Sequence, residues 1–162
     1  ANAGHTVVVG DDTYKLHHIP SGILTPNVMN VMTRGVVMNP PVIIDEIDGL
    51  IARGVAVGDN LMFSDRTHVI FPWHLAEDRI TEESSEDGQE NIGTTLRGIG
   101  PCYRDKVGRT HAIRLGDLYR DGIEDRIRSV TAAKSRTLET LGGARRRQKL
   151  REILAFERDG PA

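Results

Sequence analysis

Near the start of the chain, a short apolar run is followed by a turn and then by a run in which apolar and polar residues alternate. Val7 to Val9 form the first run, Gly10 to Asp12 form a turn, and the apolar positions of the second run are Tyr14, Leu16 and Ile19. A β-branched apolar run and an alternating run, separated by a turn that contains glycine and aspartate, are typical of a β-hairpin. The pattern therefore predicts a hairpin near the N-terminus.

A helical pattern follows a strand candidate at residues 35–38. Asn39 is suited to cap this helix, Pro41 fits its first turn, and Gly54 supplies its end. Four apolar residues fall on one face of the helix: Ile43, Ile47, Leu50 and Ile51. A helix with one apolar face is predicted to lie on the surface and to pack on a sheet.

The order of strand and helix then repeats. The sequence predicts a second strand at residues 60–64 and a second helix from about Pro72 to Ser84. Strands that alternate with helices are typical of an α/β layer.

The last third of the chain is predicted to be helical, because helical spacing is kept by Ile123, Ile127, Val130, Lys134 and Leu138. Gly142 and Gly143 interrupt the pattern. The sequence thus predicts an α/β fold, part of a central sheet flanked by helices, in one partial domain over residues 1–162. Residues 1–118 form its α/β part, and residues 119–162 form its helical part.

The composition is that of an ordinary globular protein. Of the 162 residues, 27% are charged and 38% hydrophobic, and the formal net charge is −2. This charge gives no overall attraction to nucleic acid or to an anionic membrane, and no apolar run suits a membrane span or a secretory signal. The single cysteine fits a reducing compartment, so we expect a cytoplasmic protein. The chain does not begin with methionine, and we expect both ends to be cuts in a longer chain.

The first candidate for chemistry is the segment Asn2-Ala3-Gly4-His5-Thr6. Its small residues let the backbone approach a ligand closely, and His5 can donate a proton near neutral pH. On spacing alone the segment is a weak signal, because a histidine beside a glycine is more often a turn residue with a satisfied ring.

The second candidate is the segment from Gly93 to Pro101, which Arg109 and other basic residues follow. Glycines free backbone amides to face an anion, while threonine and arginine side chains add donors for phosphate. The segment is not a Walker A loop, because Ile99 follows Gly98 where that motif has lysine. A glycine-rich connector with solvated arginines explains the same residues equally well.

Three other features are predicted to be structural. His17 and His18 are adjacent in a predicted strand and point to opposite faces, so they cannot bind one metal together, and we expect neither to be catalytic. The basic run at residues 145–147 is more often a solvated helix face than a nucleic-acid site. Trp73 is expected to be a core or interface anchor.

Taken together, the two candidate segments resemble adenylosuccinate synthetases in order and spacing. Three blocks carry the likeness: Asn2 to Thr6, His17 to Leu24, and Ile92 to Pro101. The likeness continues through Tyr103 to Arg109 and then Gly116 to Leu118. The resemblance implies that the sheet is part of one like that of the P-loop NTPases.

The resemblance also implies a reaction in which GTP phosphorylates the purine 6-oxygen of IMP and L-aspartate then displaces that phosphate. His5 matches the family's general acid, and Asn2 to His5 match positions that bind IMP. Gly4, His5 and Thr6 match a GTP contact, and the Gly4 carbonyl matches a ligand of Mg²⁺. Positioning, metal and hydrogen-bond donors are what a loose phosphoryl transition state requires.

In the second block, Thr95 matches the residue that binds the IMP phosphate. Arg109 matches the arginine that reaches the IMP site of the partner subunit, which implies a homodimer. Leu96 departs from the family, which usually has glycine there, and a leucine restricts the backbone of this loop. The chain is also one residue longer than common relatives between Arg109 and Gly116.

The resemblance further implies that parts of the enzyme are missing from this chain. These are the N-terminal glycine-rich loop with its aspartate base and phosphate-binding lysine, and the C-terminal guanine-recognition and aspartate-binding segments. We therefore expect the chain alone to be inactive. Two alternatives stay open: a non-catalytic phosphate-binding or dimerisation module that uses only Gly93 to Arg109, and a chain whose cut sheet prevents a native fold.

Overall fold

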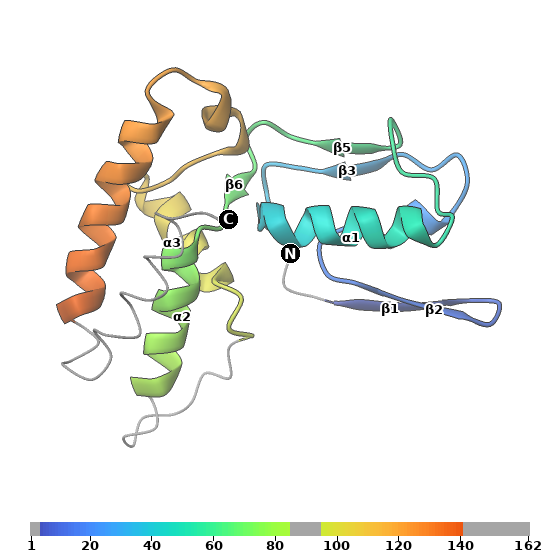
Figure 1. The fold of residues 1–162 in the computed structure, drawn as a ribbon, viewed down its shortest axis with the longest axis horizontal. Helices are drawn as coiled ribbons and strands as arrows, with labels where there is room; N and C mark the ends of the chain where they lie inside the picture. Colours follow the sequence, from blue (N-terminus) through green and yellow to red (C-terminus); the bar gives the residue numbers. More distant parts are fainter. Residues whose placement is uncertain (1–3, 85–94, 141–162) are drawn as a thin grey trace. The chain divides into compact units, whose positions relative to one another are not determined.

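The structure, a computed structural model, describes residues 4–84 and 95–140 (Figure 1). Contacts between residues divide the chain into two compact units. The first comprises Ala1–Val69 and Ile113–Tyr119, and the second comprises Ile70–Ala112 and Arg120–Ala162. We predicted a single partial domain whose α/β part ends at residue 118 and whose helical part follows. This stays a prediction.

The first unit begins with the predicted hairpin, which is confirmed. Strand β1 (His5–Val9) pairs antiparallel with β2 (Asp12–Leu16), so that His5 lies opposite Leu16 and Val9 opposite Asp12. Gly10 has a φ of 62°, the left-handed conformation that a tight hairpin turn requires. Tyr14 and Leu16 of β2 are buried, whereas β1 is almost entirely exposed.

Helix α1 (Pro40–Ala52) matches the first predicted helix. Asn39 occupies the N-cap position, but its side chain makes no capping hydrogen bond, and its carbonyl instead accepts the Ile43 amide at 3.1 Å. Gly54 follows the helix with a φ of 80°, as expected for a glycine stop. The predicted apolar face is too wide at one position, because Ile51 is 51% exposed.

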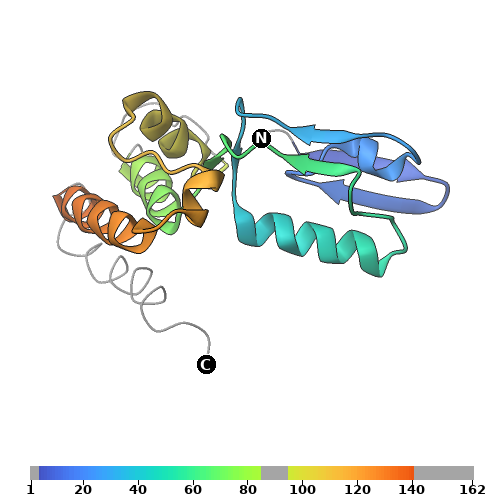
Figure 2. The same cartoon turned by 90° about the horizontal axis from the view of Figure 1, so that it is seen from above.

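Two pairs of short parallel strands complete the first unit. Strand β3 (Asn30–Met32) pairs with β5 (Leu61–Phe63), and β4 (Val37–Met38) pairs with β6 (His68–Val69). Helix α1 lies between the two halves of each pair in sequence, as a parallel connection requires. Figure 2 shows α1 running along one side of β3, β5 and the hairpin.

Two apolar clusters hold α1 against the strands. The buried residues of the first cluster are Tyr14, Leu16, Ile19, Ile23 and Leu50. Those of the second are Met32, Met38 and Ile43. Two short 3₁₀ helices contribute residues to these clusters: Ser21–Leu24 to the first and Leu115–Tyr119 to the second.

The second unit is helical. It contains α2 (Pro72–Ser84), α3 (Ile99–Gly108) and a helix whose described part covers residues 123–140. The predicted α/β class with an N-terminal hairpin is confirmed, and within the described part of the last third residues 123–140 are helical as predicted. Gly142 and Gly143, where a break was predicted, lie outside the described residues. Within the described ranges, no helix combines the length and apolar character that crossing a membrane requires.

Candidate functional site

The first predicted site segment lies at the start of the exposed strand β1. Gly4, His5 and Thr6 are all exposed, and Asn2 and Ala3 lie outside the described residues. A Cβ atom added to Gly4 would lie 3.4 Å from Nδ1 of His17 and 3.7 Å from the carbonyl oxygen of Leu16. The beginning of β1 therefore packs closely against the turn that follows β2.

A carboxylate from α1 holds that turn. The amides of three consecutive residues, His17, His18 and Ile19, donate hydrogen bonds to the carboxylate of Glu46. The His18 amide is 2.9 Å and the Ile19 amide 3.1 Å from Oε2. His17 and His18 thus lie in a bend after β2 and not in the strand where the sequence placed them. Nothing in the local pattern indicated Glu46, because the contact joins residues more than 25 positions apart.

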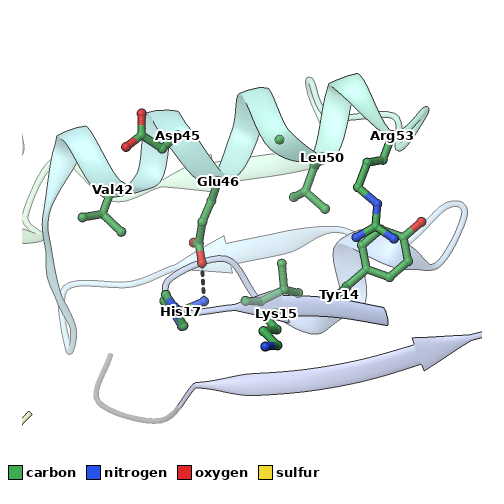
Figure 3. Close-up of a pocket in the computed structure, with 10 residues that line it drawn as sticks. Tyr14, Lys15, His17, Val42, Asp45, Glu46, Leu50 and Arg53 are labelled. Carbon is green, nitrogen blue, oxygen red and sulfur yellow. Dashed lines mark hydrogen bonds between the residues drawn. The ribbon is translucent and has the colours of Figure 1, made fainter. Parts of the chain in front are cut away.

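A cleft of about 340 Å³ lies between β2 and α1 (Figure 3). Its lining comprises Tyr14, Lys15, Leu16, His17, Val42, Asp45, Glu46, Gly49, Leu50 and Arg53. The Arg53 guanidinium lies 3.7 Å from the centre of the Tyr14 ring and donates to the Thr13 carbonyl at 2.9 Å. Its lining combines charged and apolar side chains, and it includes none of the site residues predicted from sequence.

The second predicted site segment lies in the second unit. Thr95 is exposed, Gly93 and Thr94 lie outside the described residues, and the next residue, Leu96, has a φ of 53°. Glycine favours this left-handed conformation, so the leucine adopts it at a cost in backbone strain. Arg109 directly follows α3, is exposed, and has a φ of 62°. Thr95 and Arg109 thus stand on either side of Gly98 and α3.

Helix α3 itself was not predicted, because its first residues, Ile99 to Pro101, were interpreted as the end of a phosphate-gripping loop. Gly98 is its N-cap residue, has a φ of 70°, and donates its amide to Asp78 Oδ2 at 2.9 Å. A Cβ at Gly98 would lie 2.9 Å from backbone atoms of His74 and Leu75 on α2. In the described structure, the Gly98 amide therefore binds a carboxylate of its own chain.

A buried polar cluster joins the three helices of the second unit. Lys134 donates from Nζ to Glu77 Oε1 at 3.0 Å and to Asp105 Oδ1 at 2.7 Å. His74 Nε2 lies 3.0 Å from the second oxygen of Asp105, and Arg104 pairs with Glu77. Burial alone would raise the pKa of Asp105, but hydrogen bonds from His74 and Lys134 outweigh it, so the pKa of Asp105 is lowered. The cluster is satisfied internally, which is typical of a structural network.

Cys102 lies beside this cluster and is expected to be chemically inert in the folded chain. Burial, with a smaller contribution from the negative charge of Asp105, raises the pKa of its thiol to about 12. A thiol-specific reagent at pH 8 should therefore label the folded chain very slowly and the denatured chain rapidly, because only the thiolate reacts. Mass spectrometry after timed labelling measures both rates. Equal rates in buffer and in denaturant would contradict the expected burial.

The residues present suit Mg²⁺ only in part. Among residues 4–84 and 95–140, no three His, Cys, Asp or Glu side chains are grouped as metal ligands. Gly4 is exposed, and a backbone carbonyl is the kind of hard oxygen ligand that Mg²⁺ prefers. Mg²⁺ sites commonly take one or two protein ligands and complete the shell with phosphate oxygens and water. The backbone carbonyl of Gly4 is thus chemically suited to be one ligand of a site whose other ligands are phosphate oxygens and water.

Comparison with known proteins finds the same family by a family profile and by individual relatives. A family profile described as adenylosuccinate synthetase matches residues 1–159. An adenylosuccinate synthetase from Bifidobacterium animalis subsp. lactis is 45% identical over 141 residues, which cover 86% of this chain and 32% of that protein. One from Caldanaerobacter subterraneus is 52% identical over 118 residues, covering 72% and 27% respectively.

A solved structure is similar as well. The fully ligated adenylosuccinate synthetase from Plasmodium falciparum superposes with a TM-score of 0.75 at 31% identity. The match covers 96% of this chain and 36% of that one. The chain thus spans about a third of the length of the curated relatives it matches.

Proposed function

The chain belongs to the adenylosuccinate synthetase family, and we propose that it carries part of the active site of a GTP-dependent ligase that joins L-aspartate to IMP. The observation that supports this most is the family match over residues 1–159, which includes both candidate segments. The exposure of Gly4, His5 and Thr6 also suits a segment that contacts ligands. The products are adenylosuccinate, GDP and phosphate, which places the enzyme in purine biosynthesis.

In this proposal, the segment at the start of β1 serves both nucleotides. Asn2 to His5 bind IMP, and Gly4 to Thr6 contact GTP. His5 is the general acid, and its ring donates to the phosphate oxygen on which charge develops as the γ-phosphoryl group leaves GDP. The carbonyl of Gly4 is one ligand of Mg²⁺, which neutralises phosphate charge when bound.

The proposal predicts a large loss of turnover when His5 is replaced. In the complete protein that contains this sequence, His5→Ala should lower kcat roughly a hundredfold or more, because a positioned general acid contributes about that factor. The assay follows adenylosuccinate formation from IMP, GTP and L-aspartate. Lys15→Ala is the matched control, since Lys15 is exposed and lies opposite Thr6 in the same hairpin. Near-normal turnover of His5→Ala would remove the basis of the proposed chemistry.

Thr95 and Arg109 are proposed to bind the phosphate of IMP, Arg109 from the partner subunit of a homodimer. Their exposed positions on either side of α3 suit contacts with a ligand. Thr95→Val and Arg109→Ala should each weaken IMP binding about tenfold or more, because each removes a hydrogen bond to a charged group. Arg136→Ala is the control, since Arg136 is exposed on the helix at residues 123–140. Unchanged IMP affinity in both site variants, measured by calorimetry, would argue against this assignment.

We place the enzyme in the cytoplasm and expect the 162-residue chain alone to be inactive. The complete coding sequence is expected to supply an upstream glycine-rich loop with aspartate and lysine, and a downstream arginine-rich segment. Activity of the complete protein together with inactivity of the isolated chain would support the proposal. A complete protein that binds phosphate without turnover would instead favour a non-catalytic module.

A further inference from the structure

The position of His5 depends on strand β2. Four of the five residues of β1 are exposed, and within the described residues its ladder partner is β2 alone. His5 lies opposite Leu16, the last residue of β2. Any movement of the end of β2 therefore carries the His5 backbone with it, since ladder hydrogen bonds couple the two strands.

The end of β2 is fixed in turn by helix α1. Leu16 and Ile19 are buried in the apolar cluster that contains Leu50 of α1. Apolar contacts of this kind are not directional, so they resist separation of the two elements more than they fix the turn's path. Orientation needs hydrogen bonds of defined geometry.

Glu46 supplies those hydrogen bonds. Its two carboxylate oxygens accept from the amides of His17, His18 and Ile19, and Figure 3 shows the carboxylate reaching from α1 to the turn. Successive amides that converge on one anion form a concave nest, and hydrogen bonds to a charged acceptor are stronger than neutral ones. A neutral side chain at this position would hold the turn less firmly.

The fixed turn contacts the candidate site segment directly. The His17 ring lies against Gly4, as the 3.4 Å approach of Nδ1 to an added Cβ indicates. Nδ1 of His17 is buried and has no hydrogen-bond partner within the described residues, so the ring is held there by its backbone and by packing. The amide of the same residue is one of the three that Glu46 accepts.

We infer that Glu46 is a positioning residue, which fixes the turn at His17 to Ile19 and through it sets the position of Gly4 and His5. The inference rests on the proposed function, because it assigns Glu46 a role in a reaction where His5 is the general acid. Glu46 itself does not touch a reacting group. Its effect on turnover therefore depends on the presence of the His5 ring.

A double-mutant cycle with His5 tests this dependence in the complete enzyme. Glu46→Gln keeps the shape of the side chain but removes its charge and half of its acceptor capacity. With His5 present, kcat should fall roughly tenfold to a hundredfold, since a displacement of about 1 Å costs up to that factor. In the His5→Ala background the same substitution should change kcat by less than about twofold, because nothing is left to misplace.

Asp45→Asn is the matched control. Asp45 neighbours Glu46 on α1 and lines the same cleft, but none of its hydrogen bonds go to the turn amides in the described structure. Its substitution removes the same charge and should leave kcat within about twofold. If Glu46→Gln does not fold, Glu46→Asp takes its place in the cycle, because it keeps the charge but is one methylene too short.

The outcomes separate the two proposals. An undiminished kcat in Glu46→Gln, or an equal loss with and without His5, would overturn the positioning role and leave the ligase assignment standing. Near-normal turnover of His5→Ala alone would overturn the general-acid assignment first, whatever Glu46 does. A loss that appears only when His5 is present supports the inference.

Discussion

Replacing Lys134 with methionine is expected to lower the free energy of unfolding of the chain by about 3 to 5 kcal/mol, the usual cost of removing one partner from a buried ion pair. The side chains of Lys134, Glu77 and Asp105 are 5%, 3% and 8% exposed. Without the ammonium group, two carboxylates stay buried close to each other with less compensation. Urea denaturation followed by circular dichroism measures the change.

The pKa of Asp105 provides a second measurement of the same substitution. Because its pKa is lowered in the folded chain, Asp105 stabilises the fold above the ordinary carboxyl pKa, and this contribution is lost as the pH falls through the lowered value. In Lys134→Met the burial remains while a hydrogen bond is lost, so the pKa of Asp105 should rise. Titration of its carboxyl carbon by NMR follows this shift.

Arg128→Met is the control for Lys134→Met. Arg128 lies on the same helix and pairs with Glu124 and Asp125, but its side chain is 70% exposed. An exposed pair contributes little, so the control should lose less than about 1 kcal/mol. An equal loss in the two variants would show that the buried cluster contributes no more to the free energy of unfolding than an exposed ion pair does. A chain unfolded by Lys134→Met but not by Arg128→Met agrees with the prediction.

The cluster at Lys134 also shows where sequence reasoning stopped. The spacing that predicted the helix at residues 123–140 included Lys134 among apolar positions, and the residue is indeed buried. Periodicity reports which face of a helix is buried, but it does not identify partners on other helices. Glu77 and Asp105 lie 57 and 29 positions away, so only the fold brings them to the lysine.

Element type was predictable where the pattern was long and was missed where it was short. Strand β2 alternates clearly, and α1 has apolar residues at helical spacing. Strands β3 and β6 have only three and two residues, too few for alternation to be visible. Helix α3 contains two glycines and a proline, which favour a loop on propensity, and tertiary packing overrides that preference.

The candidate site, like the fold, could be predicted only in part. The chemistry assigned to His5, Thr95 and Arg109 came from resemblance, because each residue alone has an ordinary structural explanation. Glu46 is not among the apolar positions that predicted α1, and no local feature distinguished it from Asp45. Its role follows from three backbone amides that only the tertiary fold aligns.

Gly98→Ala is expected to lower the free energy of unfolding by about 2 to 5 kcal/mol, because two costs add. The residue has a φ of 70°, which an alanine adopts only with strain. Its new Cβ would also lie 2.9 Å from the backbone of His74 and Leu75, and these atoms cannot move aside as the end of a side chain does. Separation of α3 from α2 would relieve the contact but would break the Gly98–Asp78 hydrogen bond.

Gly100→Ala distinguishes this packing role from a general need for glycine in a flexible loop. Gly100 lies two residues later, inside α3, with open space where a Cβ would stand. Alanine there should stabilise the chain by up to about 1 kcal/mol through its higher helix propensity. If both glycines served a mobile phosphate loop, both substitutions would leave stability unchanged, and the close approach of α3 to α2 would be wrong. Opposite signs in urea denaturation are expected because one glycine is required by contact and the other is not.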